Sequence, residues 1–191
     1  GDFLLAPLEG QFDFVVGNPP YVRPELIPAP LLAEYRSRYQ TMYDRADIYI
    51  PFIERSLTAL SAGGNLGFIC ADRWMKNRYG GPLRSLVAER FHLKVYVDMV
   101  DTPAFHSDVI AYPAITIISR EGGGATRIAH RPSIDRAKLT TLAGLLSAPT
   151  LPKDAGPVRE LARVTNGAEP WLLESSDQMA LIRRLEGAFP L

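Results

Sequence analysis

The chain has 191 residues, enough for one domain or for one domain with an appendage. Basic and acidic residues number 21 each, so the net charge of zero gives no global basic field that would indicate nucleic acid. The single cysteine, Cys70, excludes an internal disulfide, and the three histidines lack the spacing of a metal site. With no signal peptide and no apolar run long enough to span a membrane, we expect a cytoplasmic protein without membrane contact.

An acidic-aromatic pair, Asp2-Phe3, stands at the start of the sequence. A carboxylate can accept a hydrogen bond from an adenine amine, and a phenyl ring can pack against the base. The pair is therefore a candidate nucleoside contact. An ordinary N-terminal tail is the alternative that these two residues leave open.

A short strand followed by a rigid corner is predicted at residues 12–21. The run Phe12–Val16 is rich in aromatic and β-branched residues, which favours a buried strand covered on both faces. Gly17 ends the strand, and Asn18-Pro19-Pro20-Tyr21 follows, where the prolines restrict φ and donate no N–H. Because ligands bind beyond the carboxyl ends of strands in open α/β sheets, we expect this corner to line a site.

The side chains of this corner suit the activation of an amino group. An exocyclic amine is a poor nucleophile, because its lone pair is conjugated with the group beside it. Two acceptors on its N–H groups, the Asn18 side-chain oxygen and the Pro19 carbonyl, would favour a tetrahedral nitrogen facing an electrophile. The Tyr21 ring would hold the planar group by stacking. A proline-rich turn with a surface tyrosine is the alternative.

A helix and a second buried strand are predicted next. Apolar residues recur at helical spacing after Asp44 and Asp47, either of which can start the helix. The glycine pair Gly63-Gly64 is expected to close it. The apolar run Leu66–Cys70 then forms the strand.

The loop Ala71–Gly81 follows the end of that strand and is rich in basic and aromatic residues. It should lie on the same rim as the asparagine corner, where Arg73, Lys76 and Arg78 would bind nucleic acid. The alternative is a charged surface loop with Trp74 as its hydrophobic anchor.

The segments Leu93–Val100 and Tyr112–Ser119 read as two further strands. Only residues 101–111 separate them, too few for a helical crossover, so the two strands should pair antiparallel. A helix is expected before them, over Pro82–Arg90. We therefore predict an α/β fold with a mostly parallel sheet and a final antiparallel strand.

The pattern changes at the glycine-rich break of residues 121–125. Beyond it we predict a short extended segment at Thr126–His130, a helix over Ser133–Leu145, a proline-rich linker and a final helix over Ser175–Glu186. The predicted domain boundary therefore lies between residues 121 and 122.

Together these features resemble one family, the gamma-type N6-adenine DNA methyltransferases of restriction–modification systems, the TaqI- and Eco57I-like group. The resemblance covers residues 1–120 and, more weakly, residues 170 onward. It is carried, in order, by Asp2-Phe3, Phe12–Tyr21, Asp47-Ile48-Tyr49, Phe52, Gly63-Gly64, Leu66–Cys70, Trp74, Leu83-Arg84 and Phe105. The implied fold is a partial Rossmann-like fold that uses S-adenosylmethionine.

The resemblance implies a role for each residue of the corner. Asn18, Pro19, Pro20 and Tyr21 would form the catalytic corner, with Asn18 and Pro19 binding the target amine. Tyr21 and Phe105 would stack a flipped adenine from both sides, which offsets part of the unstacking energy.

The resemblance also implies a cofactor site, with no metal. Asp2 and Phe3 would contact the adenine of S-adenosylmethionine, and Asn18 and Phe52 would lie beside the cofactor. The glycine-rich loop and the acidic ribose ligand of the family pattern are absent from this sequence. We therefore expect residues 1–121 to be the C-terminal part of a catalytic domain that is inactive alone.

The expected partners are double-stranded DNA and a nuclease domain or subunit. Residues 122–191 would be a linker and helical extension leading to an absent recognition domain, since the tail after Trp171 resembles such a linker. The asparagine corner is specific for amino-group methylation but not for DNA. RNA adenine or protein-glutamine methylation, and a non-catalytic DNA-binding subunit with the same fold, are the alternatives.

Overall fold

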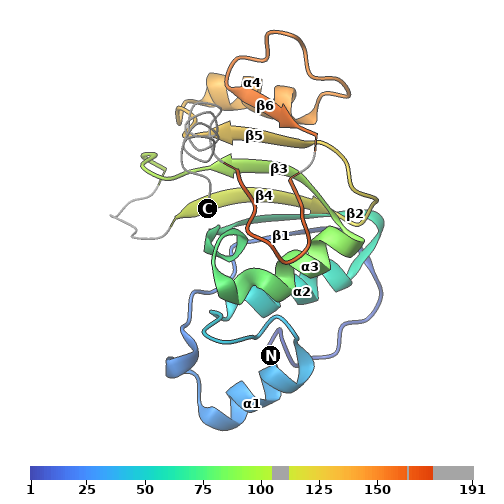
Figure 1. The fold of residues 1–191 in the computed structure, drawn as a ribbon, viewed down its shortest axis with the longest axis vertical. Coiled ribbons are helices and arrows are strands. Elements are labelled where there is room, and N and C mark those ends of the chain that lie inside the picture. The colour runs from blue at the N-terminus through green and yellow to red at the C-terminus, as the bar shows by residue number, and fades with distance from the viewer. Residues whose placement is uncertain (105–111, 163, 174–191) are drawn as a thin grey trace, which may run out of the picture.

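One six-stranded β-sheet organises the chain (Figure 1). The computed structural model describes residues 1–104, 112–162 and 164–173. Across the sheet lie β1 (Phe12–Gly17), β2 (Leu60–Ala71), β4 (Pro113–Ser119), β3 (His92–Asp98), β5 (Thr126–His130) and β6 (Val158–Leu161). The α-helices of the described residues are α1 (Ala29–Arg38), α2 (Tyr49–Thr58), α3 (Gly81–Arg90) and α4 (Arg136–Ser147).

The four strands predicted before residue 121 share this sheet. β1 is parallel to β2, and β4 is antiparallel to both of its neighbours, β2 and β3. β5 then pairs parallel with β3, and β6 pairs antiparallel with β5. The prediction of a mostly parallel sheet is wrong: the sheet is mixed, because β6 adds a second antiparallel strand. Its sequence, Val-Arg-Glu-Leu, is too short and too polar to predict a strand.

Side chains that alternate along the strands enter two separate cores. On one face, Leu66, Phe68 and Cys70 of β2 pack in a cluster with residues of α2 and α3. On the other face, Val95 and Val97 of β3 pack in a cluster with residues of α4. Successive side chains of a strand point to opposite faces of the sheet. They therefore pack against different helices.

β1 is an edge strand of the described sheet, and one of its faces is bare. Phe14 is 73% exposed and Val16 is 83% exposed, whereas Val15 packs on the core beneath α2. The prediction of burial on both faces is therefore wrong for the described residues. An apolar strand is buried only where other elements cover its faces and edges. In the described residues, β1 has one strand neighbour, β2.

The helix predicted from Asp44 or Asp47 begins later. α2 starts at Tyr49, and its N-cap residue, Ile48, makes no side-chain capping bond. The glycine pair does not close the helix either, because Gly63 and Gly64 lie inside β2. Gly64 is required there by close approach: a Cβ atom would lie 2.8 Å from the Phe12 carbonyl oxygen.

The C-terminal part of the described chain extends the sheet. The predicted segment Thr126–His130 forms β5, and the predicted helix occurs as α4, which begins at Arg136. Asp135 caps α4, since its carboxylate accepts the backbone N–H of Lys138 at 3.1 Å. The helix predicted over Ser175–Glu186 lies outside the described residues. No helix among residues 1–104, 112–162 and 164–173 is long and apolar enough to cross a membrane.

Candidate active site

The carboxyl ends of β1, β2, β3 and β5 lie along one edge of the sheet, on the left in Figure 1. We call this edge the rim. Asn18 follows β1 there and is exposed to solvent, while the next residue, Pro19, is buried. Arg73 follows β2 on the same rim. The fold therefore brings the asparagine corner and the basic loop to one edge, as the sequence predicts.

The Tyr21 side chain has a buried end and an accessible ring. Its hydroxyl reaches the end of β2, where burial raises its pKa to about 12 and the nearby Cys70 adds to the shift. A hydrogen bond with the Ala71 backbone acts in the opposite direction. The residue as a whole remains 48% exposed, and its ring lies 5.7 Å from the Tyr49 ring. The half-exposed Tyr21 side chain is therefore held at the rim, three residues after Asn18 in the chain.

Two of the four residues predicted to bind the cofactor, Phe3 and Phe52, come together, and a third, Asp2, precedes Phe3 in the chain. The Phe3 and Phe52 rings lie 4.9 Å apart, centroid to centroid. The Asp2 carboxylate accepts hydrogen bonds from the Leu4 backbone N–H at 2.8 Å and from the Tyr35 hydroxyl at 2.5 Å. These bonds fix the position of the Asp2 carboxylate and leave lone pairs for a further donor.

α2 connects these two groups of residues. Tyr49, which contacts Tyr21, and Phe52, which contacts Phe3, are three residues apart on this helix. Residues at this spacing lie next to each other on a helix surface. The predicted cofactor contacts and the asparagine corner are therefore held by adjacent positions of one rigid element.

The basic loop is anchored by Trp74, as considered from the sequence, and by Arg84, which was not singled out for this role. Arg73, Lys76 and Arg78 are exposed, whereas Trp74 is fully buried, as a hydrophobic anchor should be. Arg84 of α3 donates to the carbonyl oxygens of Trp74, Asn77 and Ala168. Its apolar helix neighbours are the sequence signal that could have marked it as buried. Phe105 lies outside the described residues.

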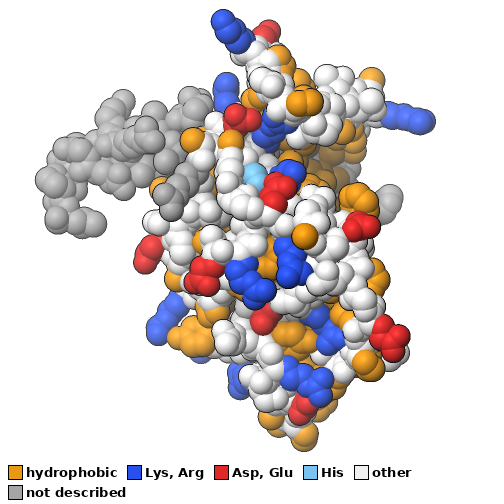
Figure 2. All heavy atoms as spheres, turned by 90° about the vertical axis from the view of Figure 1, so that its right-hand side faces the viewer, with side chains coloured by type: hydrophobic (Ala, Val, Ile, Leu, Met, Phe, Trp, Pro, Cys, Tyr) orange, Lys and Arg blue, Asp and Glu red, His pale blue; other side chains and the backbone are white. Residues whose placement is uncertain are grey.

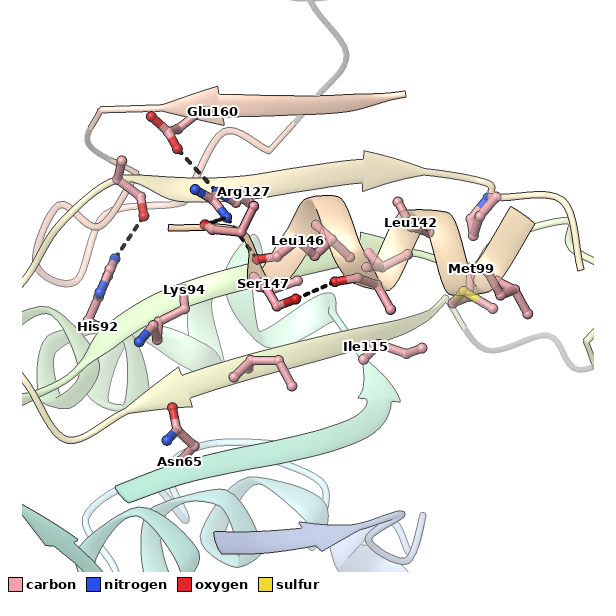
Figure 3. A pocket seen from close by; sticks show the side chains of 18 of the residues that line it. Asn65, His92, Lys94, Met99, Ile115, Arg127, Leu142, Leu146, Ser147 and Glu160 are labelled. Atoms are coloured by element: carbon pink, nitrogen blue, oxygen red, sulfur yellow. Dashed lines mark hydrogen bonds and ion pairs between the residues drawn. The ribbon is translucent and has the colours of Figure 1, made fainter. Parts of the chain in front are cut away.

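A pocket of about 860 Å³ lies elsewhere, between α4 and the sheet (Figure 3). Leu142 and Leu146 of α4 form one wall, and Met99 and Ile115 lie on the sheet side. Its polar groups are largely engaged: Arg127, for example, pairs with Glu160 at 3.2 Å. The pocket is thus an apolar surface of the sheet rather than a catalytic arrangement.

The edge of the molecule opposite the rim faces the viewer in Figure 2. Basic and acidic side chains are interspersed across it, among the residues drawn in colour. This edge therefore offers no extended basic surface for a polyanion. On the rim, by contrast, exposed polar, aromatic and basic residues occur together: Asn18, Tyr21 and Arg73.

The chain is similar to known proteins in sequence and in fold. The sequence profile of the Eco57I restriction-modification methylases matches residues 3–105, more than half of the chain. The chain belongs to this family. It is 56% identical to the type II methyltransferase M.XhoI of Xanthomonas vasicola, over 99% of this chain and 35% of that protein. It is 40% identical to the type II methyltransferase M.BstVI of Geobacillus stearothermophilus, over 95% of this chain and 33% of that protein.

The family membership confirms the resemblance found in the sequence, and the chain spans about a third of the length of these curated relatives. Among solved structures, the fold resembles a Listeria monocytogenes protein described as a class I S-adenosylmethionine-dependent methyltransferase. The TM-score is 0.59 at 14% identity, over 76% of this chain and 45% of that one. At this identity the likeness concerns the fold alone.

Proposed function

We propose that this chain is part of an enzyme that methylates the N6 amino group of adenine in DNA at specific sites, within a restriction–modification system. One observation carries the proposal: Asn18 is exposed at the carboxyl end of β1, and the half-exposed Tyr21, three residues further along the chain, reaches the end of the neighbouring strand β2 on the same rim. An amide oxygen next to a stacking surface is what the methylation of a planar amine needs.

Asn18 and Pro19 would act on the target amine. The Asn18 side-chain oxygen and the Pro19 carbonyl oxygen would each accept one N–H of the amine, which frees its lone pair from conjugation. As the methyl group arrives, positive charge develops on the nitrogen, and both oxygens would stabilise it. Pro20 stiffens the corner, and Tyr21 with Phe105 would clamp the flipped base.

S-adenosylmethionine would supply a methyl group that is already activated for transfer. The residues present fit part of this cofactor: the Phe3–Phe52 pair offers an aromatic surface, and Asp2 is a fixed carboxylate beside it. The methionine and ribose parts would be bound by residues outside this sequence. Residues 1–191 alone would therefore bind the cofactor weakly and transfer no methyl group.

DNA is favoured over RNA and protein by the family and by the names of the two similar type II methyltransferases. Residues 1–121 would then form the C-terminal part of the catalytic domain, and residues 122–191 would connect it to a recognition domain. A nuclease would be a further domain of the same protein or a separate subunit.

The test uses the whole protein and S-adenosylmethionine carrying a deuterated methyl group. Duplex DNA, RNA and release-factor protein are offered separately, and the products are hydrolysed and analysed by mass spectrometry. Labelled N6-methyladenine from DNA alone supports the proposal. Labelled adenine from RNA alone, or labelled glutamine, would identify the corresponding alternative. Binding of DNA without any labelled product would identify a non-catalytic subunit.

A further inference from the structure

The guanidinium group of Arg73 lies over the ring of Tyr112, 4.7 Å from its centroid. The backbone fixes this arrangement. Ala71, at the end of β2, pairs with Pro113, at the start of β4, and the Asp72 N–H donates to the Tyr112 carbonyl at 3.0 Å. The two side chains therefore meet on the rim because they flank one antiparallel strand pair.

Arg73 differs from the other well-positioned arginines of the chain. The donors of Arg84 and Arg55 are used on backbone carbonyls beneath the surface. Arg73 is exposed, and in the described part of the chain its guanidinium makes neither a hydrogen bond nor an ion pair within 4 Å. Its electrostatic neighbours are Asp47 and Tyr79. The group is thus oriented by the ring while its donors are unused.

The position of the pair connects it to the asparagine corner. The Tyr21 hydroxyl reaches the Ala71 backbone, and Arg73 is two residues further along the chain. The Tyr112 side chain, 48% exposed, stands beside the same strand end. An anion bound by Arg73 would therefore lie next to the base that Tyr21 stacks.

We propose that Arg73 binds a backbone phosphate next to the flipped nucleotide, and that Tyr112 is the residue that positions it. This inference rests on the proposed function. A planar guanidinium presents parallel donors that match a phosphate, and stacking on an aromatic ring holds this fork in place before the anion arrives. Less side-chain freedom is then lost on binding, so the ring strengthens the contact without touching DNA.

The test measures binding of the full-length protein to a fluorescent duplex that it methylates, between about 50 and 200 mM KCl. Arg73→Gln should lower the slope of log affinity against log salt by about one, because one phosphate contact is lost. The matched control is Arg90→Gln. Arg90 is also exposed and lies over a ring, Phe91, at 5.9 Å, but it stands at the end of α3, which leads into the opposite edge of the sheet. The control should keep the wild-type slope.

Tyr112 is tested through its dependence on Arg73. Tyr112→Leu should weaken binding and lower the salt slope, by no more than the change of about one expected for Arg73→Gln. Tyr112→Phe, which keeps the ring, should bind like the wild type. In the Arg73→Gln background, Tyr112→Leu should have no further effect. An equal loss in both backgrounds, or an unchanged slope in Arg73→Gln, would overturn the inference.

The affinity for S-adenosylmethionine, measured by calorimetry, separates two sources of the anion. Arg73→Gln should leave this affinity unchanged. If the cofactor affinity falls while the salt slope stays, the anion is the cofactor's carboxylate, and the inference is wrong. If the wild-type protein does not bind duplex DNA at all, the proposed function fails together with the inference.

Discussion

The indole rings of Trp74 and Trp171 meet edge to face, with centroids 5.2 Å apart and planes at 68°. Both side chains are fully buried. The Trp171 backbone N–H also donates to the Met75 carbonyl at 2.9 Å. A segment beyond the part that matches the family profile thus closes over the loop that carries Arg73 and Arg78. We therefore expect this contact to hold the loop in place.

Trp171→Ala should destabilise the protein by about 3–5 kcal/mol, the usual result of removing a buried large aromatic residue. Trp171→Phe should lose much less, because it keeps a ring and removes an indole N–H that has no partner among the described residues. Unfolding in urea measures both changes. Leu172→Ala is the control, because the Leu172 side chain, next in the sequence, is 50% exposed. Equal stability of Trp171→Ala and Leu172→Ala would contradict the anchoring role.

Gly80 allows a close approach of the backbone within the same loop. A Cβ atom there would lie 1.8 Å from the Trp74 carbonyl oxygen, so Gly80→Ala must displace the backbone. We expect a loss of about 1–3 kcal/mol in the free energy of unfolding. Gly144→Ala is the opposite case, because it lies in α4 with nothing within 4 Å of the new atom. It should stabilise by about 0.5–1 kcal/mol. If Gly80→Ala and Gly144→Ala change the free energy of unfolding in the same direction, Gly80 is not needed for close packing.

Asp98 should make stability depend on acid pH. Burial alone would raise its pKa, but hydrogen bonds from His130 and Val100 and the charge of Arg131 lower it overall. A carboxylate with a lowered pKa in the folded state contributes stability above its ordinary pKa, near 3.9 for aspartate. That contribution is lost as the pH falls through the lowered folded pKa.

The measurement compares the wild type with Asp98→Asn, which keeps an oxygen for the Val100 N–H now bound at 2.9 Å. The stability difference should be constant above about pH 5 and should shrink below about pH 4. Asp101→Asn is the control, because its ion pair with Arg131 is exposed and should contribute about 1 kcal/mol or less. If the stability difference between the wild type and Asp98→Asn grows as the pH falls, the pKa of Asp98 is raised in the folded state and not lowered.

Phe105 and Tyr21 are predicted to hold a flipped base between them. In the whole protein, Phe105→Ala should weaken binding to DNA that carries 2-aminopurine at the target position, by roughly 1–3 kcal/mol. Phe105→Trp should be tolerated, because it still offers a ring. The fluorescence of 2-aminopurine reports the extruded base. If Phe105→Ala unfolds the protein, or leaves both affinity and fluorescence unchanged, Phe105 is a packing residue.

The sequence predicted the parts of the fold that local pattern determines. Continuous apolar runs located β1 and β2, and alternation located β3. The short connection of residues 101–111 required the antiparallel β4. The exposed face of β1 could not be predicted, because the burial of Phe14 and Val16 depends on neighbouring elements and not on their own composition. β6 was missed because four residues carry too little pattern.

The same distinction holds for the site. Asn18 and Tyr21 could be named as candidates because the motif is local and rigid, and their role stays a prediction. The Arg73–Tyr112 pair could not, since it arises from the register between β2 and β4, which neither residue encodes by itself. The anchoring of the basic loop by Arg84 and Trp171 likewise depends on contacts between distant segments.

The central claim is that Asn18 acts on the target amine. It is tested most directly by single-turnover methyl transfer and calorimetric cofactor binding in the whole protein carrying Asn18→Ala. The rate should fall by at least about 10²-fold, the effect of removing one group that stabilises developing charge. The dissociation constant for S-adenosylmethionine should stay as in the wild type. Asn65→Ala, in the middle of β2 and six residues before its carboxyl end at the rim, should change neither quantity. An unchanged rate in Asn18→Ala would contradict the mechanism.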